Sequence, residues 1–243
     1  MAQNQVADIM PNHFFKFKQF TVFQDRCAMK VGTDGVLLGA WADVEQARRV
    51  LDIGTGTGLI ALMAAQRSQA EVCGVEVDEE AAGQACENAD ASPWKDRIRI
   101  ICKPVQAYAD GAGFDVIVSN PPYFQEQTFC PDSQRNGARH TDGLSFEELL
   151  EAVSRLLTAE GVFYVVLPAG AVDRFVGLAA ERHLYPCRHT RVHTKPDVPS
   201  KRSLLGFSRC ILPCREDSLV VELERHVYSP EYIRLTRDFY LAM

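Results

Sequence analysis

The sequence predicts an α/β protein whose mainly parallel sheet is covered by helices on both faces. Apolar runs of strand length alternate with segments of helical periodicity over most of the chain. Two of these runs end in distinctive turns, one rich in glycine and one in proline, where open α/β sheets bind ligands. After residue 181 several strands follow one another without helices between them, which predicts an antiparallel hairpin at one edge of the sheet.

The individual elements are expected in a regular order. Strands are expected at residues 50–53, 71–77, 98–102, 114–119, 162–167, 186–193, 203–210 and 219–223. Helices are expected at residues 34–42, 59–67, 79–91, 146–157, 172–181 and 231–241. Ser145 and Glu148 form a capping box that predicts the start of the helix at residue 146, and Pro230 suits the first turn of the last helix.

Length and composition fit a single domain in the cytoplasm. The 243 residues are 47% hydrophobic and 24% charged, and no apolar stretch reaches the length needed to cross a membrane. We expect residues 1–15 to be flexible, residues 16–47 to form an N-terminal extension or lid, and residues 48–243 to form the core. The eight cysteines include no Cys-x-x-Cys pair, so reduced thiols and no metal site are expected.

The glycine-rich turn reads Asp52-Ile53-Gly54-Thr55-Gly56-Thr57-Gly58. Its glycines let the backbone turn tightly and approach a ligand, while the next helix directs its first amide groups to the same place. Asp52 can accept a hydrogen bond from a ligand ammonium group, directly or through water. Glu76, at the end of the next strand, can accept both hydroxyls of a ribose, and Val77 offers an apolar edge to an adenine. These residues resemble the donor site of methyltransferases that use S-adenosylmethionine.

A dinucleotide-binding dehydrogenase is the main alternative for this turn, because it also uses a glycine loop followed by an acidic residue. The dinucleotide fingerprint Gly-x-Gly-x-x-Gly would require glycine at position 59, where this chain has Leu59. The spacing therefore favours a methyl donor over NAD.

The second turn, Asn120-Pro121-Pro122-Tyr123, resembles the acceptor site of amino-methyltransferases. An exocyclic adenine amine is a poor nucleophile because its lone pair is delocalised into the ring. The side-chain carbonyl of Asn120 and the backbone carbonyl of Pro121 can accept its two hydrogens, and the consecutive prolines fix the direction of that carbonyl. Tyr123 can stack on a flipped base. We also expect Asn120 to contact the methyl donor.

The chain resembles the bacterial tRNA1(Val) adenine-N6 methyltransferases past residue 14, most specifically in the stretch Lys30-Val31-Gly32-Thr33-Asp34-Gly35. Further matching segments lie at residues 17–20, 26–29, 36–41, 92–94, 135–140, 203–207 and 239–241. The resemblance implies a seven-stranded Rossmann-like sheet and a catalytic core over residues 48–243. It also implies S-adenosylmethionine as cofactor and methylation of N6 of the adenine 3′ to the anticodon, position 37. By the same resemblance, Lys30, Thr33 and Asp34 lie over the methionine end of the donor. An ion pair between Lys30 and Asp34 at a helix entry is the alternative.

The chain departs from the wider methyltransferase pattern after the third strand. An Asp often accepts there from the amino group of the donor adenine, whereas this chain has Pro104. Either a backbone group makes this contact or donor affinity is weaker.

Basic residues gather in one part of an acidic chain, whose net charge is −6. That charge argues against nonspecific coating of nucleic acid, but a basic stretch beside a base-methylating site fits a polyanion docked on one face. The candidate RNA-binding residues are Arg188, Arg191, Lys195, Lys201 and Arg202. A second basic cluster comprises Lys16, Lys18, Arg26 and Lys30. The expected partner is tRNA, bound by a monomer without membrane or metal.

Three other functions remain open from the sequence. The methyltransferases that modify a glutamine of peptide release factors use the same acceptor tetrapeptide, but they carry a separate helical N-terminal domain. Only 49 residues precede the first expected sheet strand here. An rRNA or DNA adenine methylase is a second alternative, and a noncatalytic RNA-binding protein of the same fold is a third.

Overall fold

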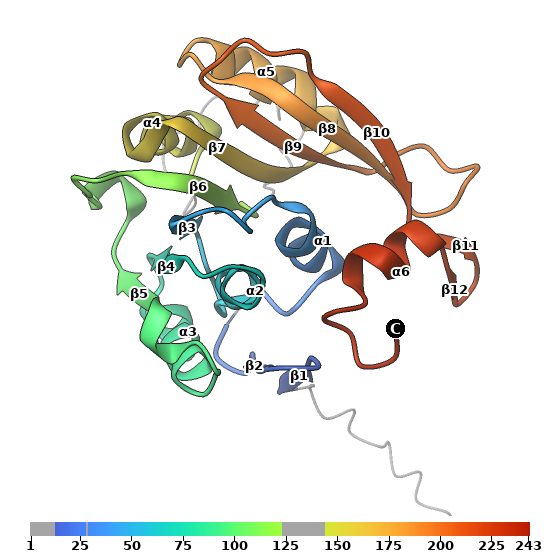
Figure 1. Ribbon diagram of the computed structural model, residues 1–243, viewed down its shortest axis with the longest axis horizontal. Coiled ribbons are helices and arrows are strands. Elements are labelled where there is room, and N and C mark those ends of the chain that lie inside the picture. Colours follow the sequence, from blue (N-terminus) through green and yellow to red (C-terminus); the bar gives the residue numbers. More distant parts are fainter. Residues whose placement is uncertain (1–12, 28, 123–143) are drawn as a thin grey trace, which may run out of the picture.

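The computed structural model describes residues 13–27, 29–122 and 144–243. Its centre is an eight-stranded sheet with the strand order β10-β8-β9-β7-β6-β3-β4-β5 (Figure 1). The strands are β3 (Arg49–Ile53), β4 (Glu71–Glu76), β5 (Ile98–Cys102), β6 (Phe114–Ser119), β7 (Leu157–Pro168), β8 (Tyr185–His193), β9 (Arg202–Ser208) and β10 (Arg215–Val220). The α-helices are α1 (Thr33–Trp41), α2 (Leu59–Arg67), α3 (Glu79–Asp90), α4 (Phe146–Leu156), α5 (Val172–Ala180) and α6 (Pro230–Thr236).

The α/β class is confirmed, and the sheet has one strand more than the seven that the family resemblance implies. Strands β7, β6, β3, β4 and β5 pair in parallel. The predicted antiparallel hairpin is formed by β8 and β9, and β9 also pairs antiparallel with β7. The hairpin does not form the edge, because β10 returns to pair in parallel with the outer side of β8.

The side chains of the central strands alternate between the two helical layers, as the period of two in a strand requires. Leu51 and Ile117 belong to the cluster that packs under α4 and α5. Their chain neighbours Val50 and Val116 belong to the cluster under α1, α2 and α6. Strands that are apolar on both faces are typical of a parallel sheet buried between helices, and Figure 1 shows helices on both sides.

The helix starts follow local capping chemistry. The capping box of Ser145 and Glu148 is present at α4, as predicted. Ser229 caps α6, whose first residue is Pro230. None of the helices in the described ranges combines the length and apolar character that crossing a bilayer requires.

The N-terminal and C-terminal parts of the chain pack together beside α1. The short hairpin of β1 (Phe14–Lys16) and β2 (Thr21–Phe23) begins within the stretch predicted to be flexible. Phe17 is buried in one cluster with Phe239, and the Lys18 amide donates to the carbonyl of Phe239 at 2.8 Å. A second small hairpin, β11 (Glu222–Glu224) and β12 (Val227–Tyr228), lies next to α6 (Figure 1).

Candidate active site

The register of two neighbouring strands brings the two predicted turns together. Ile53, the last residue of β3, lies opposite Ser119, the last residue of β6. The Ser119 hydroxyl donates to the Ile53 carbonyl at 2.9 Å, which joins the two strand ends. Gly54 and Asn120 are the next residues, so the glycine turn and the proline turn leave the sheet side by side. This is the edge at which parallel α/β sheets bind ligands.

The glycine turn needs its glycines for conformation. Gly54, Gly56 and Gly58 have φ angles of 69°, 55° and 81°, a left-handed region in which other residues are strained. A Cβ atom added at Gly54 would meet no other atom within 4 Å, so the turn leaves open space beside it. At Gly58 a Cβ atom would contact the Ala85 Cβ at 3.4 Å. The first part of the loop thus faces a space that a ligand can enter, while its end packs on α3.

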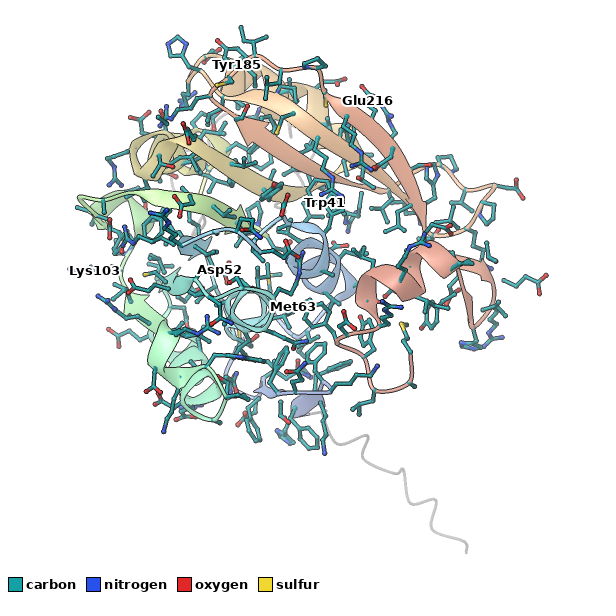
Figure 2. All side chains as sticks on the ribbon, in the orientation of Figure 1. Trp41, Asp52, Met63, Lys103, Tyr185 and Glu216 are labelled. Carbon is teal, nitrogen blue, oxygen red and sulfur yellow. The ribbon has the colours of Figure 1, made fainter. Side chains whose placement is uncertain are left out.

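Asp52 holds the glycine turn and the start of α2 from inside the molecule (Figure 2). Its Oδ2 accepts hydrogen bonds from the Thr55 hydroxyl at 2.6 Å and from the Ala61 amide at 3.2 Å. Because the N-cap residue of α2 is Gly58, which has no side chain, the Asp52 carboxylate takes the capping role. Its other oxygen, Oδ1, is buried without a hydrogen-bond partner among the described residues. Such an oxygen can accept a hydrogen bond from an N–H or O–H group of a ligand.

Burial raises the pKa of Asp52 from 3.8 to about 7, against the opposing effect of its two hydrogen bonds. Between these values the folded protein holds a proton that the unfolded chain has lost, so the free energy of unfolding falls as pH rises through this window. We expect Asp52→Asn to remove this dependence of the free energy of unfolding on pH. The difference between the free energies of unfolding at pH 4 and pH 8 should then change by on the order of 3 kcal/mol relative to the unmodified protein. Urea unfolding of both proteins across this pH range measures it, and parallel stability curves would contradict the assignment.

Glu76 connects the end of β4 to the glycine turn. Its Oε2 accepts the Gly56 amide at 2.9 Å, while Oε1 accepts the amides of Val77 at 2.8 Å and Asp78 at 3.1 Å. These bonds fix the carboxylate at the strand tip, where it was predicted to receive ribose hydroxyls. Val77 follows with 66% of its surface exposed, which leaves it available for an apolar contact.

Asn120 follows the last residue of β6 and lies near the N-terminal helix α1. A Cβ atom added at Gly35 would come within 3.8 Å of the Asn120 Nδ2 and within 3.0 Å of Leu59 Cδ2. Gly35 therefore allows α1 to approach Leu59 at the start of α2 closely, a role that the sequence analysis missed, and Asn120 lies near the same position at ordinary contact distance. Pro121 is buried and Pro122 is exposed. Tyr123 lies outside the described residues.

The three residues predicted over the methionine end of the donor lie at or just before the start of α1. Lys30 and Thr33 are exposed. The Asp34 carboxylate accepts from the Arg202 Nε at 2.7 Å, so its ion pair joins α1 to β9 rather than to Lys30. This contact brings together one residue predicted to contact the donor and one predicted to contact RNA.

The candidate RNA-binding residues fall into two groups. The Arg188 guanidinium stacks 4.0 Å from the centre of the Trp41 ring and donates to the Trp41 carbonyl at 3.1 Å, so it packs within the fold. Arg191 pairs with Glu216 at 2.9 Å, on the outer strand shown in Figure 2. Lys195 and Lys201 are exposed on the connection between β8 and β9. These two lysines are the more accessible cations of the predicted set.

One buried polar residue that the sequence analysis missed holds the loop from behind. Asn88, on α3, donates to the carbonyls of Thr57 and Phe23, each at 2.9 Å. Its Oδ1 accepts the Phe23 amide at 2.9 Å. The sequence feature that indicates this role is an amide side chain on the alanine-rich face of a helix, four residues after Gln84. Asn88 ties the glycine turn to the N-terminal hairpin.

Comparison with known proteins identifies the class of this fold and site. The family model described as the methyltransferase small domain matches residues 27–170, which is more than half of the chain. A predicted O-methyltransferase from Agrobacterium tumefaciens superposes with a TM-score of 0.66 and covers 85% of this chain and 96% of its own. At 21% identity, this second likeness concerns the fold alone.

Curated relatives are similar over almost the whole chain. The tRNA1(Val) (adenine(37)-N6)-methyltransferase of Bacteroides fragilis is 55% identical over 96% of this chain and 100% of its own. The protein of the same name from Trichodesmium erythraeum is 45% identical over 96% of this chain and 99% of its own. The chain belongs to the family of tRNA1(Val) (adenine(37)-N6)-methyltransferases, and the resemblance that the sequence indicated is confirmed.

Proposed function

We propose that this protein transfers a methyl group from S-adenosylmethionine to N6 of adenine 37 in tRNA1(Val). The observation that carries the proposal is the contact between two strand ends, joined by the bond from Ser119 to Ile53 at 2.9 Å. One end presents a glycine turn and the other presents Asn120. The relatives named for this activity, which match over 96% of the chain, support the same substrate.

The residues around the glycine turn fit this donor. The unpartnered Oδ1 of Asp52 supplies an acceptor for the ammonium group, directly or through water. Glu76 supplies a carboxylate for the ribose hydroxyls, and Val77 an apolar surface for adenine. When bound, the donor supplies a methyl group that its sulfonium has already made electrophilic. No metal or covalent intermediate is then needed.

The residues of the proline turn act on the acceptor amine. The Asn120 side-chain carbonyl and the Pro121 backbone carbonyl accept its two hydrogens. These contacts draw the nitrogen towards tetrahedral geometry and stabilise the positive charge that develops as the new bond forms. Gly35 of α1 lies beside this amide, because a Cβ atom added there would come within 3.8 Å of the Asn120 Nδ2. Tyr123 completes the site as a stacking surface for the base.

The tRNA is expected to cover the face that carries the connection between β8 and β9. Lys195 and Lys201 are exposed there, and Arg202 pairs with Asp34 at the start of α1. Phosphate contacts from such cations position the RNA without reading its sequence. A monomer can meet these requirements, because the proposed donor and acceptor residues all belong to one chain, and the cytoplasm is where a tRNA substrate is found.

The proposed function is tested with purified protein, labelled S-adenosylmethionine and total tRNA from a strain that lacks this activity. We expect label in one valine tRNA and N6-methyladenosine at position 37 after nuclease digestion and mass analysis. A peptide release factor and rRNA serve as competing substrates in parallel reactions. Transfer to the release factor or to rRNA alone would replace the proposal with one of those activities, and donor binding without any transfer would indicate a noncatalytic protein.

A further inference from the structure

A groove with aromatic walls opens between the N-terminal hairpin, the start of α1, and α6 with its neighbouring hairpin. It encloses a cavity of about 600 Å³. The rings of Phe15, Tyr228, Tyr232 and Tyr240 line it. Tyr228 and Tyr232 lie with ring centres 5.2 Å apart, and Phe15 contacts Tyr240 edge-on with ring centres 6.0 Å apart. None of these rings has a role in the proposed donor or acceptor sites.

The groove lies next to the proposed acceptor site. Thr33, the first residue of α1, lines the groove. Gly35, two residues further along the same helix, lies near Asn120, because a Cβ atom added there would come within 3.8 Å of the Asn120 Nδ2. The two positions are about 3 Å apart along the axis and lie on opposite sides of the helix, so the groove and Asn120 flank the start of α1. Gly32 and Thr33 are exposed at this helix end, so an RNA strand that crosses it can reach both the groove and Asn120.

The chemistry of the walls suits an unpaired nucleotide. Aromatic side chains stack on bases whatever their sequence, because every base presents a flat face. Lys16, which is exposed, brings a cation to the lining and can contact a phosphate. Glu222 also lines the groove, so the lining is not uniformly basic. Tyr228 is 37% exposed, which leaves part of its ring accessible to a partner.

We propose that this groove binds a nucleotide of the RNA substrate that neighbours the methylated adenine in the chain. The inference rests on the proposed function, since it takes the same RNA as ligand. Flipping a base into the acceptor site removes it from its stack and leaves its neighbours with a free face. Stacking of one neighbouring base against Tyr228 offsets part of that cost and fixes the direction in which the RNA strand runs.

The test compares Tyr228→Ala, Tyr228→Phe and Lys16→Ala with the unmodified protein. The probe is a fluorescently labelled tRNA1(Val) transcript, and its Kd is measured by anisotropy. Loss of one stacking contact is expected to raise the RNA Kd about tenfold in Tyr228→Ala, whereas Tyr228→Phe keeps it within about twofold. Lys16→Ala is expected to weaken RNA binding and to make its dependence on salt shallower. The Kd for S-adenosylhomocysteine, measured by calorimetry, stays unchanged in all three.

Val227→Ala is the matched control, because Val227 is 49% exposed on the same strand but does not line the groove. Equal RNA affinity in Tyr228→Ala and Val227→Ala would overturn the inference. A loss of donor affinity without a loss of RNA affinity would also overturn it and assign the groove to the donor. If the unmodified protein methylates no tRNA, the proposed function itself fails, and that result is separate from either outcome.

Discussion

Replacing Asn120 by alanine is expected to lower kcat for methyl transfer by a factor of about 100 to 1,000, the usual effect of removing one preorganised polar group at a reacting centre. The amide lies near Gly35, directly after the end of β6, where we propose that it contacts the acceptor amine. The donor is expected to bind mainly through Asp52 and Glu76, which the substitution leaves in place. Single-turnover transfer to tRNA measures the loss, and calorimetry with S-adenosylhomocysteine measures donor affinity.

The ratio of the two losses is the informative quantity for Asn120. Transfer that falls while donor affinity stays within about twofold supports a role in the acceptor site. An equal fall in both would show that Asn120 acts mainly on the donor, and unchanged transfer would remove it from the mechanism. Thermal melting of the variant, compared with the unmodified protein, separates these outcomes from a loss of folding.

Replacing Glu76 by alanine is expected to raise the donor Kd by at least about 100-fold. The substitution removes the acceptor proposed for two ribose hydroxyls, and hydrogen bonds to a charged group contribute about 1.5–3 kcal/mol each. It also leaves the Gly56 amide without its carboxylate partner, which now lies at 2.9 Å. Because both effects act on donor binding, KM for the donor should rise far more than kcat falls.

Glu71→Ala provides the control for Glu76, because Glu71 lies at the opposite end of the same strand and is exposed. The same loss of charge there is expected to leave the donor Kd unchanged. Glu76→Gln keeps one carbonyl acceptor and should fall between the two. A Glu76→Ala protein that binds donor as tightly as Glu71→Ala would exclude the ribose contact.

The sequence predicted the elements of the site better than their arrangement. The apolar runs before Asp52 and Asn120 identified two buried strands, and their turns identified the ligand edge. That Ile53 lies directly opposite Ser119 depends on the pairing of β3 with β6, across two intervening strand–helix units. Pairing at this separation has no local signal. The expectation that these two strands are neighbours came from the family resemblance rather than from the periodicity of the sequence.

The edge of the sheet shows the limit of local patterns most clearly. The segment Arg215-Glu216-Asp217 is polar, so the expected strand began only at residue 219. In the structure these residues pair with β8 from Arg188 onwards, and β10 becomes the edge strand of the sheet. Charged side chains are common on edge strands, so this strand lacks the apolar pattern by which buried strands are predicted.

The basic residues illustrate a second limit. Arg188 and Lys201 look equivalent in a count of charges, yet Arg188 packs on Trp41 while Lys201 is exposed. Arg209 is likewise occupied, with its guanidinium donating to the Leu157 carbonyl at 3.1 Å next to the end of α4. A long cationic side chain can pack within the protein or contact a binding partner, and only its surroundings in the structure distinguish the two.

The hydrophobic cluster that contains both Phe17 and Phe239 has a consequence for how the chain folds on the ribosome. The N-terminal hairpin is synthesised early, but part of its apolar cover comes from Phe239, which is translated more than 200 residues later. Until Phe239 emerges, Phe17 lacks a neighbour that it has in the finished protein. Nascent chains that stall before residue 239 therefore expose this hairpin to chaperones.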